Sequence, residues 1–136
     1  MSFAYLLDTS VLSQPLKDQP LRGVQRRWTP ERSSQLCTSA ICQAELLRGL
    51  EMRQSEKLWR RYRDYLEGEV TILPFDAQVA GIYARLCAQL QITGSRRDMA
   101  DLLIAAAAIA ADLTLATLNA RHFQNLGGLR MEDWTN

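Results

Sequence analysis

With 136 residues, the chain is long enough for one domain with a sizeable core and too short for two ordinary ones, so we expect residues 1–136 to form one domain. Its 47% hydrophobic residues are typical of a globular protein, and we see neither a signal-peptide pattern nor an apolar run of ~18 residues. We therefore expect a cytoplasmic protein without a membrane partner. A net charge of +1 excludes a strong overall basic field, although 14 of the 16 cations are arginines, which favour phosphate or carboxylate contacts.

The first half of the chain alternates short apolar runs with segments of helical character. The run FAYLL stops abruptly at Asp8, which forms a set of helix-capping residues with Thr9 and Ser10. Asp8 is therefore expected at the carboxyl end of a buried strand. In this half the pattern predicts a strand over 3–7, a short helix over 21–28, a strand over 36–39, and helices over 40–52 and 56–66 that pack as a hairpin.

The second half contains the most apolar stretch, in which every side chain from Leu102 to Ala111 is apolar. A helix of this composition should be buried on nearly all sides, yet it is too short to span a membrane. Ser95, Asp98 and Asp101 lie around its first turn, where helix N-termini collect hydrogen-bond acceptors. The other elements predicted here are a strand over 70–73, a helix over 76–91, a strand over 113–117 and an edge strand over 129–131.

Strands that alternate with helices indicate an α/β fold, with a mainly parallel central sheet of four to five strands flanked by helices. In such sheets, ligands bind beyond the carboxyl ends of the strands. Polar residues are expected at that edge from four places in the chain. Asp8 and Asn119 follow strands, whereas Glu45 and Asp101 lie in the first turns of helices.

Carboxylates that apolar elements hold together repel one another and resist desolvation, and a divalent cation relieves both costs. Oxygen ligands without paired cysteines or histidine favour Mg²⁺ or Mn²⁺, and such a site supports hydrolysis of a phosphodiester. We therefore predict that Asp8, Glu45 and Asp101 bind the metal and that the amide of Asn119 positions a water. The only histidine, His122, is interpreted as a surface or packing residue.

Three further residues near this predicted site have interpretations of their own. Asp98 either caps the apolar helix or serves as a substitute metal ligand. Arg48 is three residues after Glu45 and can form a surface ion pair with it. Gly49 is interpreted as allowing another backbone to approach the helix closely.

Two helical segments contain more aromatic residues than one small core can readily bury. Such residues commonly anchor interfaces, so we predict a homodimer formed through residues 48–66 and 78–91. The aromatic residues concerned are Trp59, Tyr62, Tyr65 and Tyr83.

Five segments carry a family resemblance: YLLDTSVLS from Tyr5, SAICQAELLRGL from Ser39, DLLIAAAAIA from Asp101, ATLNARHF from Ala116 and GGLRMEDW from Gly127. In this order they resemble the PIN-domain ribonuclease toxins of the VapC type, over essentially the whole chain. The resemblance implies a metal-dependent endoribonuclease that acts on RNA. It also implies a bacterial toxin–antitoxin pair, in which the toxin forms a homodimer and binds a small antitoxin.

Site residues follow from the resemblance position by position. Asp8, Glu45 and Asp101 match the first three acids of the family, and Asn119 stands where a fourth acid is found. Thr9 and Thr117 match hydroxyl positions near the site, which implies contacts with a water or with a phosphate oxygen of the substrate. The antitoxin is expected to cross the acidic edge and to present an Arg or Lys to it.

Two other readings of the acidic edge remain. The edge could dock a basic peptide of a partner without catalysis, as a binding or regulatory module. Phosphotransfer through an aspartyl nucleophile would require a second Asp two residues after Asp8, where Ser10 stands.

Overall fold

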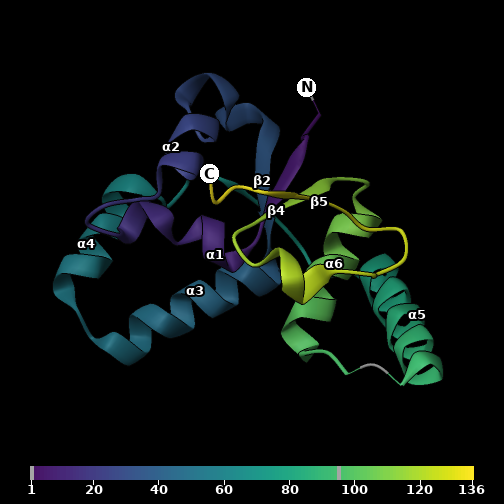
Figure 1. The fold of residues 1–136 in the computed structure, drawn as a ribbon. Coiled ribbons are helices and arrows are strands. Elements are labelled where there is room, and N and C mark those ends of the chain that lie inside the picture. The colour runs from purple at the N-terminus through teal and green to yellow at the C-terminus, as the bar shows by residue number, and fades with distance from the viewer. Residues whose placement is uncertain (1, 95) are drawn as a thin grey trace.

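A computed structural model describes residues 2–94 and 96–136, and its centre is a parallel sheet (Figure 1). The strands are Tyr5–Leu7 (β1), Leu36–Ser39 (β2), Thr71–Leu73 (β3), Thr114–Thr117 (β4) and Arg130–Asp133 (β5). Their order in the sheet is β3-β2-β1-β4-β5, and every pairing is parallel. The predicted α/β class is confirmed, and the first strand of the sequence lies in the middle of the sheet.

Helices surround this sheet (Figure 1). The α-helices are Thr9–Leu12 (α1), Arg22–Arg27 (α2), Ala40–Arg53 (α3), Glu56–Tyr65 (α4), Ala77–Thr93 (α5) and Met99–Ala110 (α6). Short 3₁₀ helices cover Gln14–Leu16 (η1), Pro30–Gln35 (η2) and Ala120–Phe123 (η3). In the described part of the chain, none of the helices combines the length and the apolar character needed to cross a membrane.

Side chains on the two faces of the sheet enter different cores, as the two-residue period of a strand requires. Leu6 and Leu115 belong to the larger core, which α3, α5 and α6 cover. Leu7 and Ala116, which follow them in the sequence, belong to a second core that contains Trp134 and residues of α1 and α2. The central strands β1 and β4 are therefore covered on both faces.

Side-chain caps begin several helices at the predicted residues. Ser39 Oγ accepts a hydrogen bond from the backbone amide of Cys42, at 3.1 Å, where α3 begins. Asp98 Oδ1 accepts one from the amide of Ala100, at 2.8 Å, where α6 begins. The capping interpretation of Asp98 is therefore confirmed, whereas Ser95 lies outside the described residues.

The predicted hairpin packing of the two helices that follow β2 is wrong. In Figure 1, α3 and α4 meet at an open angle, and α4 packs mainly on η1. Gln54, between the two helices, adopts a left-handed conformation with φ of 50°, and Ser55 then caps α4. This sharp change of direction opens a hollow between the helices, which remain linked by a hydrogen bond from Gln43 to the Tyr62 hydroxyl, at 2.7 Å.

The C-terminal segment is held closely against α2. Trp134 is 1% exposed, and its ring meets that of Tyr5 edge to face, with the centroids 5.4 Å apart. A Cβ atom on Gly23 would lie 2.2 Å from the Trp134 carbonyl oxygen and 2.8 Å from the Asn136 nitrogen. Because both are backbone atoms, no side-chain rotation would relieve the clash.

We predict that Gly23→Ala lowers the free energy of unfolding by about 1–3 kcal/mol, the usual cost of overpacking. Gly81→Ala is the matched control, because a Cβ atom at this α5 position meets nothing within 4 Å. It should be neutral or stabilising by at most ~1 kcal/mol, since alanine favours helix. Urea denaturation of both variants measures the difference, and equal stability would show that the C-terminal segment does not constrain Gly23.

Candidate active site

The four predicted site residues line one hollow of about 390 Å³ at the carboxyl edge of the sheet. Asp8 directly follows β1, and Asn119 lies two residues beyond β4. Glu45 comes from α3, and Asp101 from the first turn of α6. The structure therefore brings together polar residues that are more than 110 positions apart in the sequence.

Asp8 is the most buried of these residues, with an exposed fraction of 3%. Its Oδ1 atom accepts hydrogen bonds from the Val11 amide, at 3.0 Å, and from the Ser10 hydroxyl, at 2.5 Å. Its Oδ2 atom accepts one from the Thr117 hydroxyl, at 2.5 Å. Burial raises the pKa of the Asp8 carboxyl, and these hydrogen bonds offset only part of that effect.

Thr117 lies next to the site, as the resemblance implied, but its hydroxyl faces Asp8 and not the solvent. Its side chain is fully buried, so its hydroxyl does not reach an RNA in solution. The hydroxyl instead donates to Asp8 and accepts from the backbone amide of Asn119, at 2.9 Å. Direct substrate binding by Thr117 does not fit this burial, and its contacts assign it to holding Asp8 in place.

Glu45 is exposed and lies at the opening of the hollow. Its Oε1 atom accepts a hydrogen bond from the Thr9 hydroxyl at 2.5 Å. The predicted ion pair with Arg48 does not form among the residues that the structure describes. Arg48 instead lines the same hollow, so a cation stands beside the carboxylates.

His122 was not expected at the site, and the interpretation as a mere surface or packing residue is incomplete. It is exposed, but its Nδ1 atom lies 3.3 Å from Asp101 Oδ2 and it lines the hollow. Burial raises the pKa of the Asp101 carboxyl, the charge of His122 lowers it, and the neighbouring charges of Asp98 and Glu45 raise it further. The feature of the sequence that could have placed His122 at the site is its position, three residues after Asn119 in the segment that leaves β4.

The loop that carries His122 and Asn119 has its own support. Arg97 donates hydrogen bonds to the backbone carbonyls of His122, at 3.0 Å, and Gln124, at 2.6 Å. Asp98 follows Arg97 but does not line the hollow, because its carboxylate caps α6. The metal-ligand interpretation of Asp98 therefore has no support in its position.

The residues of the hollow fit a hard divalent cation by the chemistry of their donors. Three carboxylates and one amide offer oxygen atoms, and burial already penalises the charge on Asp8 and Asp101. Within 2–94 and 96–136, no three acidic, histidine or cysteine side chains meet closely enough to hold an ion by themselves. Mg²⁺ commonly keeps several waters and uses only one or two carboxylates, so such a site requires no closed cage.

Comparison with known proteins agrees with this architecture. The PIN domain family matches residues 5–129. A VapC ribonuclease from Sinorhizobium fredii, Y4jK, is 35% identical over 128 residues, which are 90% of this chain and 91% of that protein. The chain therefore belongs to the PIN-domain family.

Its relatives place it, within that family, among the VapC-type proteins. The tRNA(fMet)-specific endonuclease VapC from Shigella flexneri is 28% identical over 131 residues, with 96% of this chain and 98% of that protein covered. The structure is similar to that of DNA-bound VapBC from Salmonella typhimurium, with a TM-score of 0.83, 29% identity, and 97% of this chain and 98% of that one covered. The resemblance inferred from the five sequence segments is confirmed.

We predict that, without metal, the Tm difference between Asp8→Asn and the wild type shifts in favour of the wild type by roughly 2–5 °C as pH falls from neutral to about 4. The folded-state pKa of Asp8 lies above its ordinary value, so the ionised carboxylate costs stability at neutral pH. That cost disappears in the wild type as pH falls through the folded-state pKa, whereas the uncharged amide of the variant does not titrate.

Thermal melts in EDTA between neutral pH and about pH 4 measure this difference. The lower limit is close to the ordinary pKa of an aspartate. Asp98→Asn is the control, because its amide can keep the exposed cap of α6, and its Tm should stay close to the wild-type value. A Tm difference between Asp8→Asn and the wild type that stays constant with pH would contradict the prediction.

Proposed function

We propose that this chain is a metal-dependent endoribonuclease toxin that hydrolyses RNA phosphodiester bonds and is neutralised by a cognate antitoxin. The observation that carries the proposal is the convergence of Asp8, Glu45, Asp101 and Asn119 in one hollow at the sheet edge. Membership of the PIN-domain family and similarity to VapC ribonucleases support it.

In this proposal Asp8, Glu45 and Asp101 hold Mg²⁺ or Mn²⁺, directly or through waters. The chemistry that the cation supplies when bound is a lower pKa of a coordinated water and neutralisation of charge on phosphodiester oxygens. Thr117, Ser10 and the Val11 amide fix the Asp8 carboxylate, so its two oxygens keep a constant direction. Such neighbouring groups tune both affinity and activity.

The remaining residues of the hollow have roles that their positions suggest. Thr9 orients Glu45 through a hydrogen bond, and His122 contacts Asp101. The side-chain amide of Asn119 can accept a hydrogen bond from the attacking water. Arg48 supplies a positive charge for a phosphate oxygen in the same hollow.

An antitoxin is the proposed partner in the resting state. VapBC-5 from Mycobacterium tuberculosis, to which the structure is similar, is a member of the VapBC family of toxin–antitoxin systems. In this chain, carboxylates whose ionisation burial penalises would gain a counter-charge from an Arg or Lys of the antitoxin. The antitoxin would then occupy the site in competition with the metal and the RNA.

Incubation of the purified, antitoxin-free protein with total RNA tests the proposed activity. We expect cleavage with MgCl₂ or MnCl₂ and none in EDTA. Loss of a group in the metal shell typically costs roughly 10- to 100-fold in activity or metal affinity, so Asp8→Asn and Asp101→Asn should lose at least that much. Asp98→Asn should cleave at nearly the wild-type rate, because it retains the cap.

Thermal melts with MnCl₂ provide a second measurement. A cation at 100 times its dissociation constant should stabilise the wild type by ~2.7 kcal/mol and leave Asp101→Asn nearly unchanged. The absence of cleavage with metal, together with equal Tm shifts in both proteins, would instead favour an acidic edge that only binds a partner. If Asp98→Asn loses cleavage and Asp101→Asn keeps it, Asp98 and not Asp101 is the third acid of the site.

We also propose a homodimer through the helical segments 48–66 and 78–91. Met52 and Tyr65 support it, because they are 67% and 61% exposed, whereas Tyr62 is buried and belongs to the core. Static light scattering at micromolar concentration should give twice the 15.4 kDa of one chain. A species with the mass of one chain would leave these exposed side chains in solvent.

A further inference from the structure

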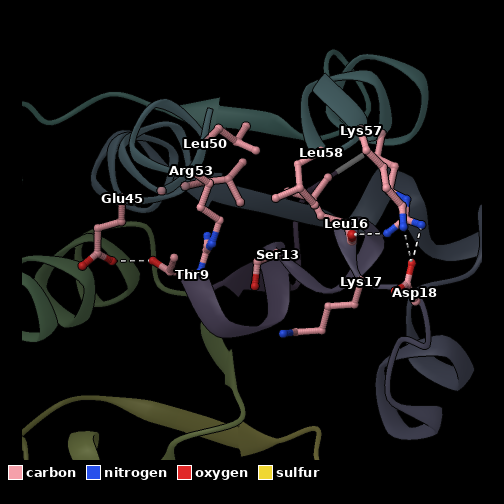
Figure 2. A pocket seen from close by; sticks show the side chains of 13 residues that line it. Thr9, Ser13, Leu16, Lys17, Asp18, Glu45, Leu50, Arg53, Lys57 and Leu58 are labelled. Carbon is pink, nitrogen blue, oxygen red and sulfur yellow. Dashed lines mark hydrogen bonds and ion pairs between the residues drawn. The ribbon is translucent and has the colours of Figure 1, made fainter. Parts of the chain in front are cut away.

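A second hollow, of about 630 Å³, opens between α3, α4 and the segment formed by α1 and η1 (Figure 2). We call it the α3–α4 groove. Thr9, Ser13 and Glu45 line both this groove and the candidate active site. A ligand could therefore pass continuously from one hollow into the other.

The charged side chains of the α3–α4 groove are mainly positive, and only some of them form ion pairs. At its far end Asp18 pairs with Lys57, at 3.2 Å, and with Arg61, at 2.5 Å. Lys17 and Arg53 also line the groove, and within the described part of the chain neither has a carboxylate within 4.0 Å. Two cations are therefore available to an anion that enters.

The fold holds these two cations toward the active-site end of the groove. Figure 2 shows the guanidinium of Arg53 and the ammonium of Lys17 directed toward the part of the chain that carries Ser13. Gly49 leaves space for Arg53, because a Cβ atom at position 49 would lie 3.2 Å from Arg53 Nη1. Gly49 thus accommodates a side chain rather than the neighbouring backbone that the sequence suggested.

Lys17 gains its position from a neighbouring arginine. Arg61 donates a hydrogen bond to the Leu16 carbonyl, at 2.8 Å, and also binds Asp18. It therefore fixes the residues on both sides of Lys17. The wall that carries this ammonium is tied to α4.

The floor of the α3–α4 groove is apolar. Leu46 and Leu50 from α3 are buried, and Leu16 and Leu58 complete the lining. A nucleotide matches this combination, because the faces of its base are apolar and its phosphate is anionic. The volume lies within the ~300–1,000 Å³ of typical ligand pockets.

We propose that the α3–α4 groove binds the RNA strand beside the scissile bond, with Arg53 and Lys17 contacting a neighbouring phosphate. The proposal deepens the endoribonuclease function and rests on it. The backbone of Arg53 is eight residues beyond Glu45, or about 12 Å along α3 at 1.5 Å per residue, and its guanidinium reaches back to Gly49, four residues beyond Glu45. Because Arg53 and Lys17 line the groove and not the hollow with the carboxylates, we assign them to a phosphate next to the phosphodiester that is cut.

Fluorescence anisotropy with a labelled single-stranded RNA of mixed sequence, in EDTA and at a series of KCl concentrations, tests this proposal. Arg53→Gln and Lys17→Gln should each weaken binding about tenfold at low salt, the scale of a lost charge-assisted hydrogen bond. Each should also reduce the slope of log affinity against log salt by about 0.7, the value for one phosphate contact with a single strand. Arg32→Gln is the control, because Arg32 is exposed, lies outside both hollows and outside the proposed dimer segments, and should behave like the wild type.

Melting temperatures and the shift with MnCl₂ should stay at wild-type values in all three variants, which separates lost RNA contacts from a damaged fold. If Arg53→Gln and Lys17→Gln keep the wild-type affinity and salt slope, while the wild type cleaves RNA with metal, the groove does not bind the RNA strand. The proposed nuclease function would be unaffected by that result. Unchanged RNA binding with weaker antitoxin binding would assign the groove to the protein partner and also overturn the proposal. If the wild type shows no metal-dependent cleavage, the proposed function itself is wrong.

Discussion

The buried carboxylate of Asp8 is the constraint around which the rest of the structure is arranged. It lies just beyond the middle strand of the sheet and is 3% exposed. An ionised group in such a place is costly unless hydrogen bonds stabilise it. The donors come from α1, which the same carboxylate caps, and from the end of β4. One side chain therefore ends a strand, starts a helix and defines the functional edge.

Much of the fold could be predicted from the sequence, because the strands β1 to β4 lie in short runs rich in apolar residues and several helices began with a capping residue. The carboxyl ends of parallel strands share one edge, so Asp8 and Asn119 could be placed together without coordinates. Glu45 and Asp101 followed from the starts of their helices. These inferences depend on local pattern and on the geometry common to all parallel sheets.

Other features depended on the path of the chain in space. His122 reaches Asp101 because η3 turns back toward α6, and the contacts of Arg97 that support this loop are not local. The burial of Thr117 depends on Asp8 being its partner. The angle between α3 and α4 follows from the left-handed conformation of Gln54, whereas the apolar stripes of both helices were equally compatible with a hairpin.

The hydrogen bond between Thr117 and Asp8 joins residues 109 positions apart, and this has a consequence for the order of events during synthesis. All three carboxylates emerge from the ribosome before Thr117 does. Until β4 pairs with β1, Asp8 lacks this hydrogen bond and the cover that buries it. Closing a loop of this length also costs entropy before the contact is gained. An incomplete nascent chain thus carries the acidic residues without the arrangement that would make them a site.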